Sequence, residues 1–456
     1  MSTLPFSIQF LGAAKTVTGS KYFLRMGSVG VLVDCGIFQG YREIKQRNEI
    51  PLAVPVADID YVLLTHGHLD HAGYLPKLVK DGFRGKVMGS APTLDLAEII
   101  LLDSGKIQEE EALRSNRFHP DGEPEQALYT AEDAKEAIQR FSPVEEGKWF
   151  KISSDISVRF EYIGHILGAT SIEIEYQGKR IVFSGDIGRE KDFLLHPFHK
   201  PERADVLLLE STYGSKKHPK ESGKEALKHV VLENALKKGT LILPCFAVER
   251  SQTIMYLLWQ LLKEKQIPAM KMVLDSPMAA QVFELFKQHP DWHEVDPKDL
   301  HDMMSQFTFI RKFKDSIREV DSNEPKIVIA GSGMLSGGRV LRYLQKYIGD
   351  EDATVALTGF QAVGTKGRRL AEGAQSLRIY GRDYSVKAKI VNFEMFSAHA
   401  DQDDIMDWVS EINNTPEKVF LIHGEEVSML AFKDYLKDQK GWEGIIPEHN
   451  ELVDLS

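Results

Sequence analysis

The stretch "THGHLDHAG", residues 65–73, places four side chains that commonly bind metal ions within six positions. They are His66, His68, Asp70 and His71. The stretch follows the apolar run "IDYVLL", which predicts a buried strand, and it precedes a helix expected to begin near Ala72. Zinc takes about four ligands, and a catalytic site leaves one position for water. We therefore expect a metal site at this turn, with the first two histidines on one ion and the last two ligands on a second.

Four ligands from one turn cannot complete two coordination shells, so distant parts of the chain must supply more. Three candidates each stand where an apolar run meets glycine: His165 in "GHILGAT", Asp186 in "FSGDIGR" and His423 in "FLIHGEE". At such a point a strand releases a side chain into a cleft, and the carboxylate of Asp186 can bridge two cations. A single histidine at a strand end is more often a hydrogen-bonded core residue, so the prediction depends on the clustering in residues 66–71.

The pattern of apolar residues divides the chain into three stretches. Up to about residue 190, short apolar runs punctuated by glycine predict strands, including a hairpin that turns at Gln177–Gly178. From about residue 205, apolar runs alternate with helical patterns, which is typical of a parallel α/β sheet. Strand and helix patterns of the first kind return after about residue 375. With 456 residues, two domains are expected.

The composition restricts the compartment and the partners. The net charge is -11, so a nucleic acid would need a local basic patch or bound metal ions. The two cysteines, Cys35 and Cys245, are isolated, which excludes a disulfide scaffold and fits a reducing compartment. We see no signal-peptide pattern and no apolar run that could span a bilayer, so we expect a cytoplasmic protein without a membrane partner. The sequence leaves a homodimer open.

These residues resemble the metallo-β-lactamase superfamily. "HGHLDH" matches its H-x-H-x-D-H signature, and Asp34 in "LVDCG", His165 and Asp186 match its other core motifs. The second half resembles the β-CASP branch of nucleic-acid nucleases, through Glu210 in "LLLESTYG" (motif A), His399 in "FSAHAD" (motif B) and His423 in "LIHGEE" (motif C). Within this branch the chain is most similar to bacterial homologues of the endonuclease subunit of the eukaryotic cleavage and polyadenylation specificity factor.

The resemblance implies a fold, two zinc ions and an RNA substrate. The implied α/β fold is an αββα sandwich, residues 1–207 and 373–456, with an inserted β-CASP domain, residues 208–372. The implied ligands are His66, His68, His165 and Asp186 for one Zn²⁺ and Asp70, His71, Asp186 and His423 for the other. We expect Asp34 to orient a ligand histidine from behind. Because motif C is usually valine in DNA-repair members, His423 favours RNA.

For catalysis we hypothesise that a hydroxide shared by two zinc ions attacks a phosphodiester in line. His399, with Glu210 beside it, is the expected general acid for the leaving 3′-oxygen, and Asp70 is expected to act both as a ligand and in catalysis. The products would carry a 5′-phosphate and a 3′-hydroxyl, and cutting is expected within the RNA. A purely structural hydrogen-bonded pair is the alternative for His399 and Glu210.

Contacts to the RNA are expected from the inserted domain. The stretch "GSGMLSGGR", which includes Ser332 and Gly333, leads from a predicted strand into a helix and can present backbone N–H groups to phosphate. A local basic patch is expected from four arginines, Arg250, Arg339, Arg368 and Arg369. A packing turn and ordinary solvated charges are the structural alternatives. Arg342 and Tyr343 stand where bacterial relatives often have paired histidines.

Three other functions remain open from the sequence. The same dinuclear core can hydrolyse small thioesters or lactams, but such an enzyme needs neither the inserted domain nor His399. A DNA nuclease of the same branch is disfavoured by His423. A non-catalytic RNA-binding scaffold is difficult to reconcile with a full ligand set.

Overall fold

A computed structural model of the chain describes residues 6–118, 124–219, 221–359, 361 and 364–456. The chain forms two compact units. Unit 1 consists of residues 1–192, 197–217 and 399–456, and unit 2 consists of residues 193–196 and 218–398. The limits at 217/218 and 398/399 differ from the predicted domain limits of 207/208 and 372/373. The second difference arises because the strand Lys389–Asn392 (β19) pairs with a strand of unit 2.

Unit 1 contains two seven-stranded sheets, each with an antiparallel half and a parallel half. The first sheet has the order β22-β1-β2-β3-β4-β5-β6. Its strands are β1 (Phe6–Phe10), β2 (Tyr22–Met26), β3 (Val29–Val33), β4 (Tyr61–Leu63), β5 (Lys86–Ser90), β6 (Phe141–Val144) and β22 (Leu452–Asp454). Pairing is antiparallel from β22 to β3 and parallel from β3 to β6.

The second sheet of unit 1 has the order β21-β20-β11-β10-β9-β8-β7. Its strands are β7 (Phe150–Lys151), β8 (Ile156–Tyr162), β9 (Thr170–Tyr176), β10 (Lys179–Phe183), β11 (Val206–Glu210), β20 (Lys418–Ile422) and β21 (Gly444–Ile445). Pairing is antiparallel from β7 to β10 and parallel from β10 to β21. The predicted hairpin is confirmed, since Gln177 and Gly178 join β9 to β10 with φ values of 51° and 81°.

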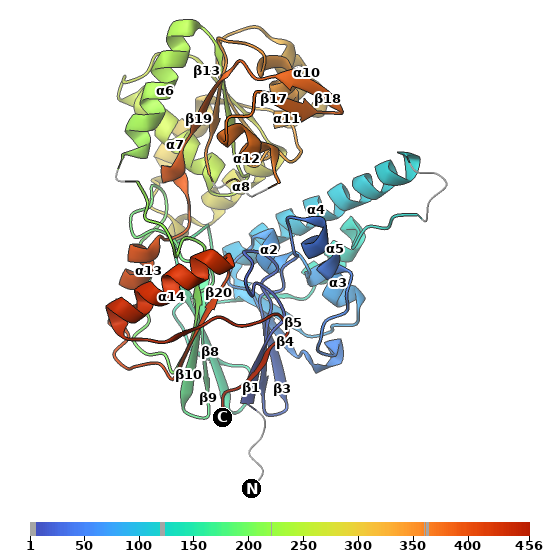
Figure 1. Cartoon of the computed structure of the whole chain (residues 1–456), viewed down its shortest axis with the longest axis vertical. Coiled ribbons are helices and arrows are strands. Elements are labelled where there is room, and N and C mark those ends of the chain that lie inside the picture. Colours follow the sequence, from blue (N-terminus) through green and yellow to red (C-terminus); the bar gives the residue numbers. More distant parts are fainter. Residues whose placement is uncertain (1–5, 119–123, 220, 360, 362–363) are drawn as a thin grey trace. The chain divides into compact units, whose positions relative to one another are not determined.

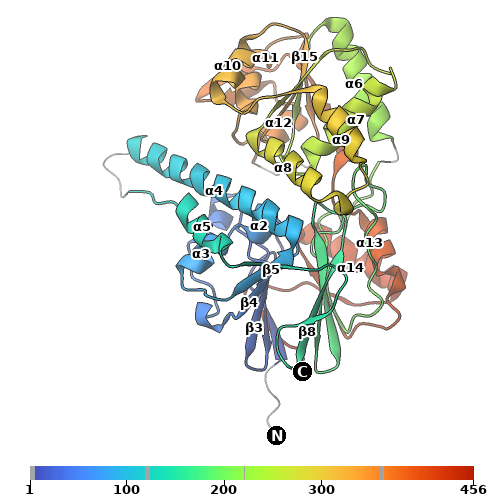
Figure 2. The same cartoon turned by 180° about the vertical axis from the view of Figure 1, so that it is seen from behind.

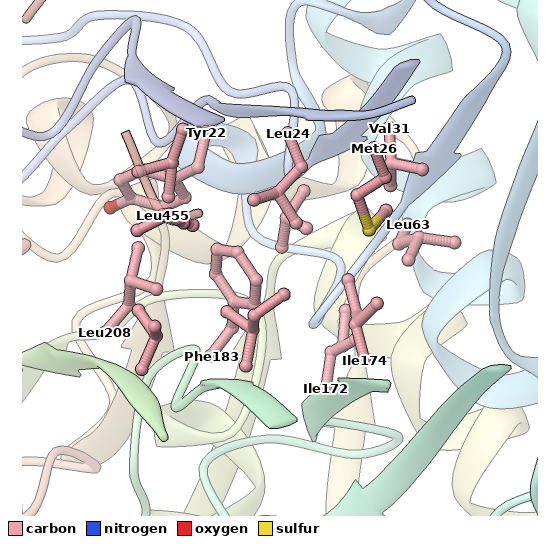
Figure 3. Packing of buried hydrophobic residues seen from close by; sticks show 14 of the residues in the cluster. Tyr22, Leu24, Met26, Val31, Leu63, Ile172, Ile174, Phe183, Leu208 and Leu455 are labelled. Atoms are coloured by element: carbon pink, nitrogen blue, oxygen red, sulfur yellow. The ribbon is translucent and has the colours of Figure 1, made fainter. Parts of the chain in front are cut away.

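The main core of unit 1 lies between its two sheets. In β1 and β8, buried and half-buried side chains alternate, so one face of each strand is available to a core. Leu24, Met26 and Leu63 point from the first sheet toward Ile172 and Phe183 of the second (Figure 3). Burial of these side chains removes apolar surface from water and fixes the sheets face to face.

Helices cover the outer faces of unit 1. Those over the first sheet are α2 (Leu69–Ala72), α3 (Leu75–Lys80), α4 (Ala91–Phe118) and α5 (Ala131–Ile138) (Figure 2). Two helices, α13 (Gln402–Trp408) and α14 (Glu426–Lys440), lie beside β20 of the second sheet (Figure 1). The short pieces are α1 (Arg42–Lys45), η1 (Gln46–Asn48), η2 (Val56–Asp58) and η5 (Val409–Glu411). The layers are thus helix, sheet, sheet and helix, which confirms the predicted sandwich.

The helix expected near Ala72 begins earlier, at Leu69. Its N-cap is His68, which keeps an extended backbone with φ −60° and ψ 152°. The chain therefore turns into α2 directly after the second histidine of the "THGHLDHAG" stretch, and Asp70 and His71 lie within this short helix. Among the residues that the structure describes, no helix combines the length and the apolar character needed to cross a bilayer.

Unit 2 is built on a six-stranded parallel sheet with the order β14-β13-β15-β12-β16-β19. Besides β19, its strands are β12 (Thr240–Pro244), β13 (Lys271–Asp275), β14 (Phe307–Phe309), β15 (Lys326–Ala330) and β16 (Thr354–Leu357). Strands β12, β15 and β16 are buried along their whole length, as expected for a parallel sheet with both faces covered. This confirms the predicted change to an α/β pattern.

The first helix of unit 2 precedes β12, and the others lie between strands of this sheet. They are α6 (Gly223–Lys237), α7 (Arg250–Lys263), α8 (Pro277–Gln288), α9 (Pro297–Ser305), α10 (Phe313–Asp321), α11 (Val340–Tyr347) and α12 (Lys366–Ala371). Two single-turn helices, η3 (Pro290–Trp292) and η4 (Glu394–Phe396), and a two-stranded antiparallel sheet of β17 (Ser376–Ile379) and β18 (Arg382–Ser385) complete the unit.

Candidate metal centre

The predicted ligands lie on segments that follow strands of unit 1. His66 and His68 follow β4, and Asp70 and His71 follow on α2. His165 comes three residues after β8, Asp186 comes three residues after β10, and His423 comes directly after β20. The structure brings all seven side chains together in two groups that share Asp186.

The first group contains His66, His68, His165 and Asp186. Nδ1 of His68 lies 3.1 Å from Nε2 of His66 and 3.3 Å from Nε2 of His165. Oδ2 of Asp186 lies 3.5 Å from Nε2 of His66 and 3.5 Å from Nε2 of His165. Four possible donor atoms therefore face one point, as the sequence predicted for this set.

The second group contains Asp70, His71 and His423, and Asp186 lies beside it. Nε2 of His423 lies 3.1 Å from Nε2 of His71 and 3.6 Å from Oδ2 of Asp70. The other oxygen of Asp186, Oδ1, lies 3.3 Å from Nε2 of His71. One carboxylate thus presents one oxygen to each group, which is the geometry that a bridging ligand requires.

The donor atoms fit divalent metal ions. In a tetrahedral site with ligands about 2.1 Å from the ion, neighbouring donor atoms lie about 3.4 Å apart, close to the separations in both groups. Oδ1 of Asp186 is buried and accepts no hydrogen bond from the residues that the structure describes, so a cation would satisfy it. Burial lowers the pKa of His68 to about 4 and that of His66 well below its usual value, which leaves the neutral imidazoles that bind metal.

Hydrogen bonds behind the rings fix the orientation of two ligands. Nδ1 of His71 lies 2.8 Å from Oδ2 of Asp34, and the Thr65 hydroxyl lies 2.9 Å from the same oxygen. The Thr65 hydroxyl also lies 3.0 Å from Nδ1 of His66. If this hydroxyl donates to Asp34, it accepts from His66, so one carboxylate orients a histidine of each group. The position of Asp34 is as predicted, whereas sequence reasoning missed Thr65.

Thr212 contacts His423 in the same way. Its hydroxyl lies 3.0 Å from Nδ1 of His423 and 3.0 Å from the carbonyl oxygen of His423. The backbone N–H of His423 donates to the carbonyl of Ala13, and its φ is 49°. A non-glycine residue in this left-handed region is uncommon, and these contacts hold it there.

His399 and Glu210 form a pair beside the first group. Nδ1 of His399 lies 3.4 Å from Oε1 of Glu210 and 3.9 Å from Oδ2 of Asp186. Glu210 is fully buried and accepts backbone N–H bonds from Ile187 at 2.6 Å and Thr212 at 3.3 Å. Burial lowers the pKa of His399, but the carboxylates of Glu210, Asp186 and Asp70 outweigh burial and raise the pKa to about 9.

Three family descriptions match successive parts of the chain. The Metallo-beta-lactamase superfamily matches residues 18–230, the Beta-Casp domain matches residues 251–370, and the Zn-dependent metallo-hydrolase RNA specificity domain matches residues 383–447. Ribonuclease TTHA0252 of Thermus thermophilus is 34% identical over 442 residues, which cover 94% of this chain and 95% of that protein.

The chain belongs to the β-CASP branch of the metallo-β-lactamase superfamily. It is a metal-dependent hydrolase, as predicted. Transcription termination factor FttA of Methanosarcina mazei is 31% identical over 438 residues, covering 91% of this chain and 66% of that protein. A crystal structure of a protein of unknown function from Enterococcus faecalis shares the fold, with a TM-score of 0.54 at 13% identity, and covers 99% of this chain and 100% of that one.

The predicted RNA contacts of the β-CASP domain all lie in unit 2. Arg339 donates from Nη1 to Oδ1 of the buried Asp275 at 2.6 Å, so its charge is already paired inside the domain. Arg368 pairs with Glu372 at 2.6 Å, and Arg369 donates to the carbonyl of Ser376 at 3.3 Å. Arg250 is buried, with 8% of its surface exposed. The predicted basic patch is therefore largely engaged in contacts within unit 2.

The glycine-rich loop after β15 also makes internal contacts. The Ser332 hydroxyl accepts from the N–H of Ser336 at 3.2 Å, and the carbonyl of Gly333 accepts from the side chain of Gln361 at 3.1 Å. A Cβ at Gly333 would lie 2.8 Å from the ring of Phe246, so this position requires glycine. Binding of phosphate by Ser332 and Gly333 stays a prediction.

Proposed function

We propose that this chain is a zinc-dependent ribonuclease that hydrolyses RNA phosphodiester bonds and cuts within the RNA. RNA as the substrate is supported by the name of the Thermus relative and by the RNA specificity domain matched at residues 383–447. The observation that carries the proposal is the carboxylate of Asp186, which faces both ligand groups and lies beside His399.

The proposed metal ligands are those predicted from the sequence. One Zn²⁺ would be held by His66, His68, His165 and Asp186, and a second by Asp70, His71, Asp186 and His423. When bound, the two ions would lower the pKa of a water molecule toward neutrality and neutralise the phosphate oxygens.

His399 is the proposed general acid. With its pKa raised to about 9, the ring holds a proton at neutral pH and can donate it to the leaving 3′-oxygen. Nδ1 faces Glu210, so the Nε2–H group is the proposed donor to the substrate. Donation to the 3′-oxygen leaves a 3′-hydroxyl on one product and a 5′-phosphate on the other.

Glu210 is proposed to position His399. Its two carboxylate oxygens are held by the backbone N–H groups of Ile187 and Thr212, so the carboxylate cannot rotate freely. A fixed carboxylate of this kind sets both the ring orientation and the protonation of the histidine that it contacts. The same reasoning makes Thr65, Asp34 and Thr212 positioning residues for the ligands.

The test is digestion of 5′-labelled and 3′-labelled single-stranded RNAs by the zinc-loaded protein, with both product ends mapped. We expect internal cuts that leave 5′-phosphate and 3′-hydroxyl ends, and no cutting by a His399→Ala variant that retains its zinc. A thioester and lactam panel and single-stranded DNA of the same sequence are assayed beside the RNA. Turnover of the panel or of the DNA, with RNA left intact, would contradict the proposal. A homodimer stays a prediction.

A further inference from the structure

An exposed aromatic ring lies at the carboxyl end of a β-strand in unit 2. Helix α10 begins at Phe313, four residues after β14 ends at Phe309. Phe313 is 52% exposed, and the guanidinium carbon of Arg342 lies 4.6 Å from the centre of its ring. One turn further along α10, Ile317 is also exposed. The ring thus lies beyond the carboxyl end of β14, which is an edge strand of the sheet.

Positive residues are concentrated in the sequence around this ring. Residues 311–318 contain four cations and one carboxylate, in a chain whose net charge is -11. Arg311 and Arg318 are 69% and 77% exposed, and their nearest carboxylates, Glu284 and Asp315, lie 3.9 and 3.5 Å away. Within the part of the chain that the structure describes, no ion pair joins Lys312, Lys314 or Arg342 to a carboxylate. We call Arg311, Lys312, Phe313, Lys314, Arg318 and Arg342 the basic platform.

Buried contacts hold the basic platform from behind. The fully buried carboxylate of Asp275 accepts from the hydroxyl of Ser316 on α10 at 2.6 Å and from the hydroxyl of Tyr343 on α11 at 2.9 Å. The side chain of Arg339 completes this set at 2.6 Å. The two helices that carry Phe313 and Arg342 are thus fixed to the same carboxylate. A ring held in place in this way loses little freedom when it binds a ligand.

We propose that the basic platform binds single-stranded RNA. Proteins that bind single strands combine cations that contact the backbone with aromatic rings on which bases stack, and the platform has both. The guanidinium of Arg342 already lies beside the ring of Phe313, so a base would stack on an aromatic–cation pair. An acidic protein would also be attracted by the cations, so the test below includes an acidic polypeptide. The inference rests on the proposed function and extends it to a second RNA-binding surface.

The test measures binding of the full chain to a fluorescent 20-nucleotide oligoadenylate by anisotropy, with a chelator present to prevent cleavage. Phe313→Ala is expected to weaken binding about tenfold, because it removes one stacking platform. Phe313→Trp is expected to restore binding. The double variant Lys312→Glu/Lys314→Glu is expected to weaken binding at least as much. It should also reduce the slope of log affinity against log salt by roughly 1.4, at roughly 0.7 for each lost phosphate contact.

The matched control is Lys237→Glu/Lys298→Glu, which changes the net charge equally at two exposed lysines of unit 2. It is expected to bind within twofold of the unchanged chain. Equal affinity of the Phe313→Ala, Lys312→Glu/Lys314→Glu and unchanged chains would overturn the inference. Fluorescent polyglutamate is the second probe and stands for an acidic protein. The inference would also be overturned if Lys312→Glu/Lys314→Glu weakened the binding of polyglutamate as much as that of RNA, while Phe313→Ala left RNA binding unchanged.

The outcome is separable from that of the proposed function. Cleavage of a short RNA by the zinc-loaded protein is measured in parallel. If the platform variants lose RNA binding while no RNA is ever cut, the proposed function fails and the platform stands. If RNA is cut normally and the variants bind as the unchanged chain does, the platform fails and the proposed function stands.

Discussion

The hydroxyl of Thr212 lies 3.0 Å from Nδ1 of His423 and 3.0 Å from the carbonyl oxygen of the same residue. A hydroxyl that donates to the carbonyl can only accept from the ring, so Nδ1 of His423 carries the proton. Nε2 is then free of a proton on the side of Asp70 and His71. The tautomer that can bind a metal ion is thus selected by a threonine.

Replacement of Thr212 tests this selection. Thr212→Val is expected to weaken the binding of one of the two zinc ions about 10- to 100-fold, because the ring of His423 loses the hydroxyl that contacts its Nδ1. Thr212→Ser keeps the hydroxyl and should bind zinc like the unchanged chain. Competition with a chromophoric chelator measures both affinities. Equal zinc binding by the valine and serine variants would show that Thr212 does not position the ligand.

Asp34 is expected to affect both zinc ions. Its carboxylate contacts His71 directly and His66 through Thr65, and these two histidines belong to different groups. Asp34→Ala should therefore weaken both zinc affinities, again about 10- to 100-fold, whereas Thr212→Val weakens one. The same chelator titration separates the two cases. Loss of a single zinc in the Asp34 variant would contradict the role of Thr65.

Glu210 is expected to control the alkaline limit of activity. The Glu210 carboxylate is the largest of the contributions that raise the pKa of His399, so its removal lowers that pKa. A general acid must be protonated, so the loss of rate at high pH should begin at a lower pH in Glu210→Gln. The measurement is kcat/KM for RNA between pH 6 and 10. If the fall of kcat/KM at high pH is the same in both proteins and their zinc content is equal, His399 is not the general acid.

The sequence predicted the gathering of the ligands and the support from Asp34, but not the supports from Thr65 and Thr212. His66, His68, Asp70 and His71 stand out because their residue types are clustered, and His165, Asp186 and His423 because each follows an apolar run. The predicted fold class and family were confirmed for the same reason, since their motifs are local. Thr65 and Thr212 were missed because a threonine near a strand end has no distinctive pattern.

Contacts between distant residues were equally hard to predict. The sequence predicts Arg339 as part of a basic patch for RNA, but the structure pairs it with Asp275, 64 positions earlier. Nothing near Arg339 in the sequence indicates this partner. The basic platform is not distinctive in the sequence, because a short charged helix is usually an ordinary solvated one. The exposure of Phe313 distinguishes it, and exposure is visible only in the fold.

The pair of Arg339 and Asp275 is expected to stabilise unit 2. Asp275 is fully buried, so Arg339→Met leaves a buried carboxylate without its cation, at a cost of about 3–5 kcal/mol in the free energy of unfolding. Adding Asp275→Asn should recover part of this loss, because no charge then remains buried. Urea unfolding of the single and double variants measures both the loss of stability and its recovery. A double variant less stable than Arg339→Met would contradict this account.

Lys21 gives an expected dependence of stability on pH. It is 1% exposed, donates to the carbonyl of Gly36 and lies 4.4 Å from the ring centre of Phe38. Burial lowers the pKa of Lys21 to about 8 from 10.5. Between these values the unfolded chain binds more protons, so the free energy of unfolding rises with pH, by about 3 kcal/mol in total.

The Lys21→Met variant removes this dependence. The difference in unfolding free energy between the unchanged chain and the variant should grow in favour of the unchanged chain from pH 8 to pH 10.5. All other titrating groups are common to both chains and cancel in the difference. Denaturant unfolding at several pH values gives the measurement. A difference that stays constant with pH would show that Lys21 titrates normally in the fold.

The most direct test of the central claim is the zinc content and the RNA cleavage of an Asp186→Ala variant, measured on the same sample. Asp383→Ala, an exposed aspartate in β18, is the control. We predict two zinc ions per chain and cleavage for the unchanged and control proteins. For the Asp186 variant, which lacks the carboxylate shared by both groups, we predict fewer than one zinc ion and no cleavage. Cleavage at the unchanged rate by a folded, zinc-free Asp186→Ala protein would contradict the account.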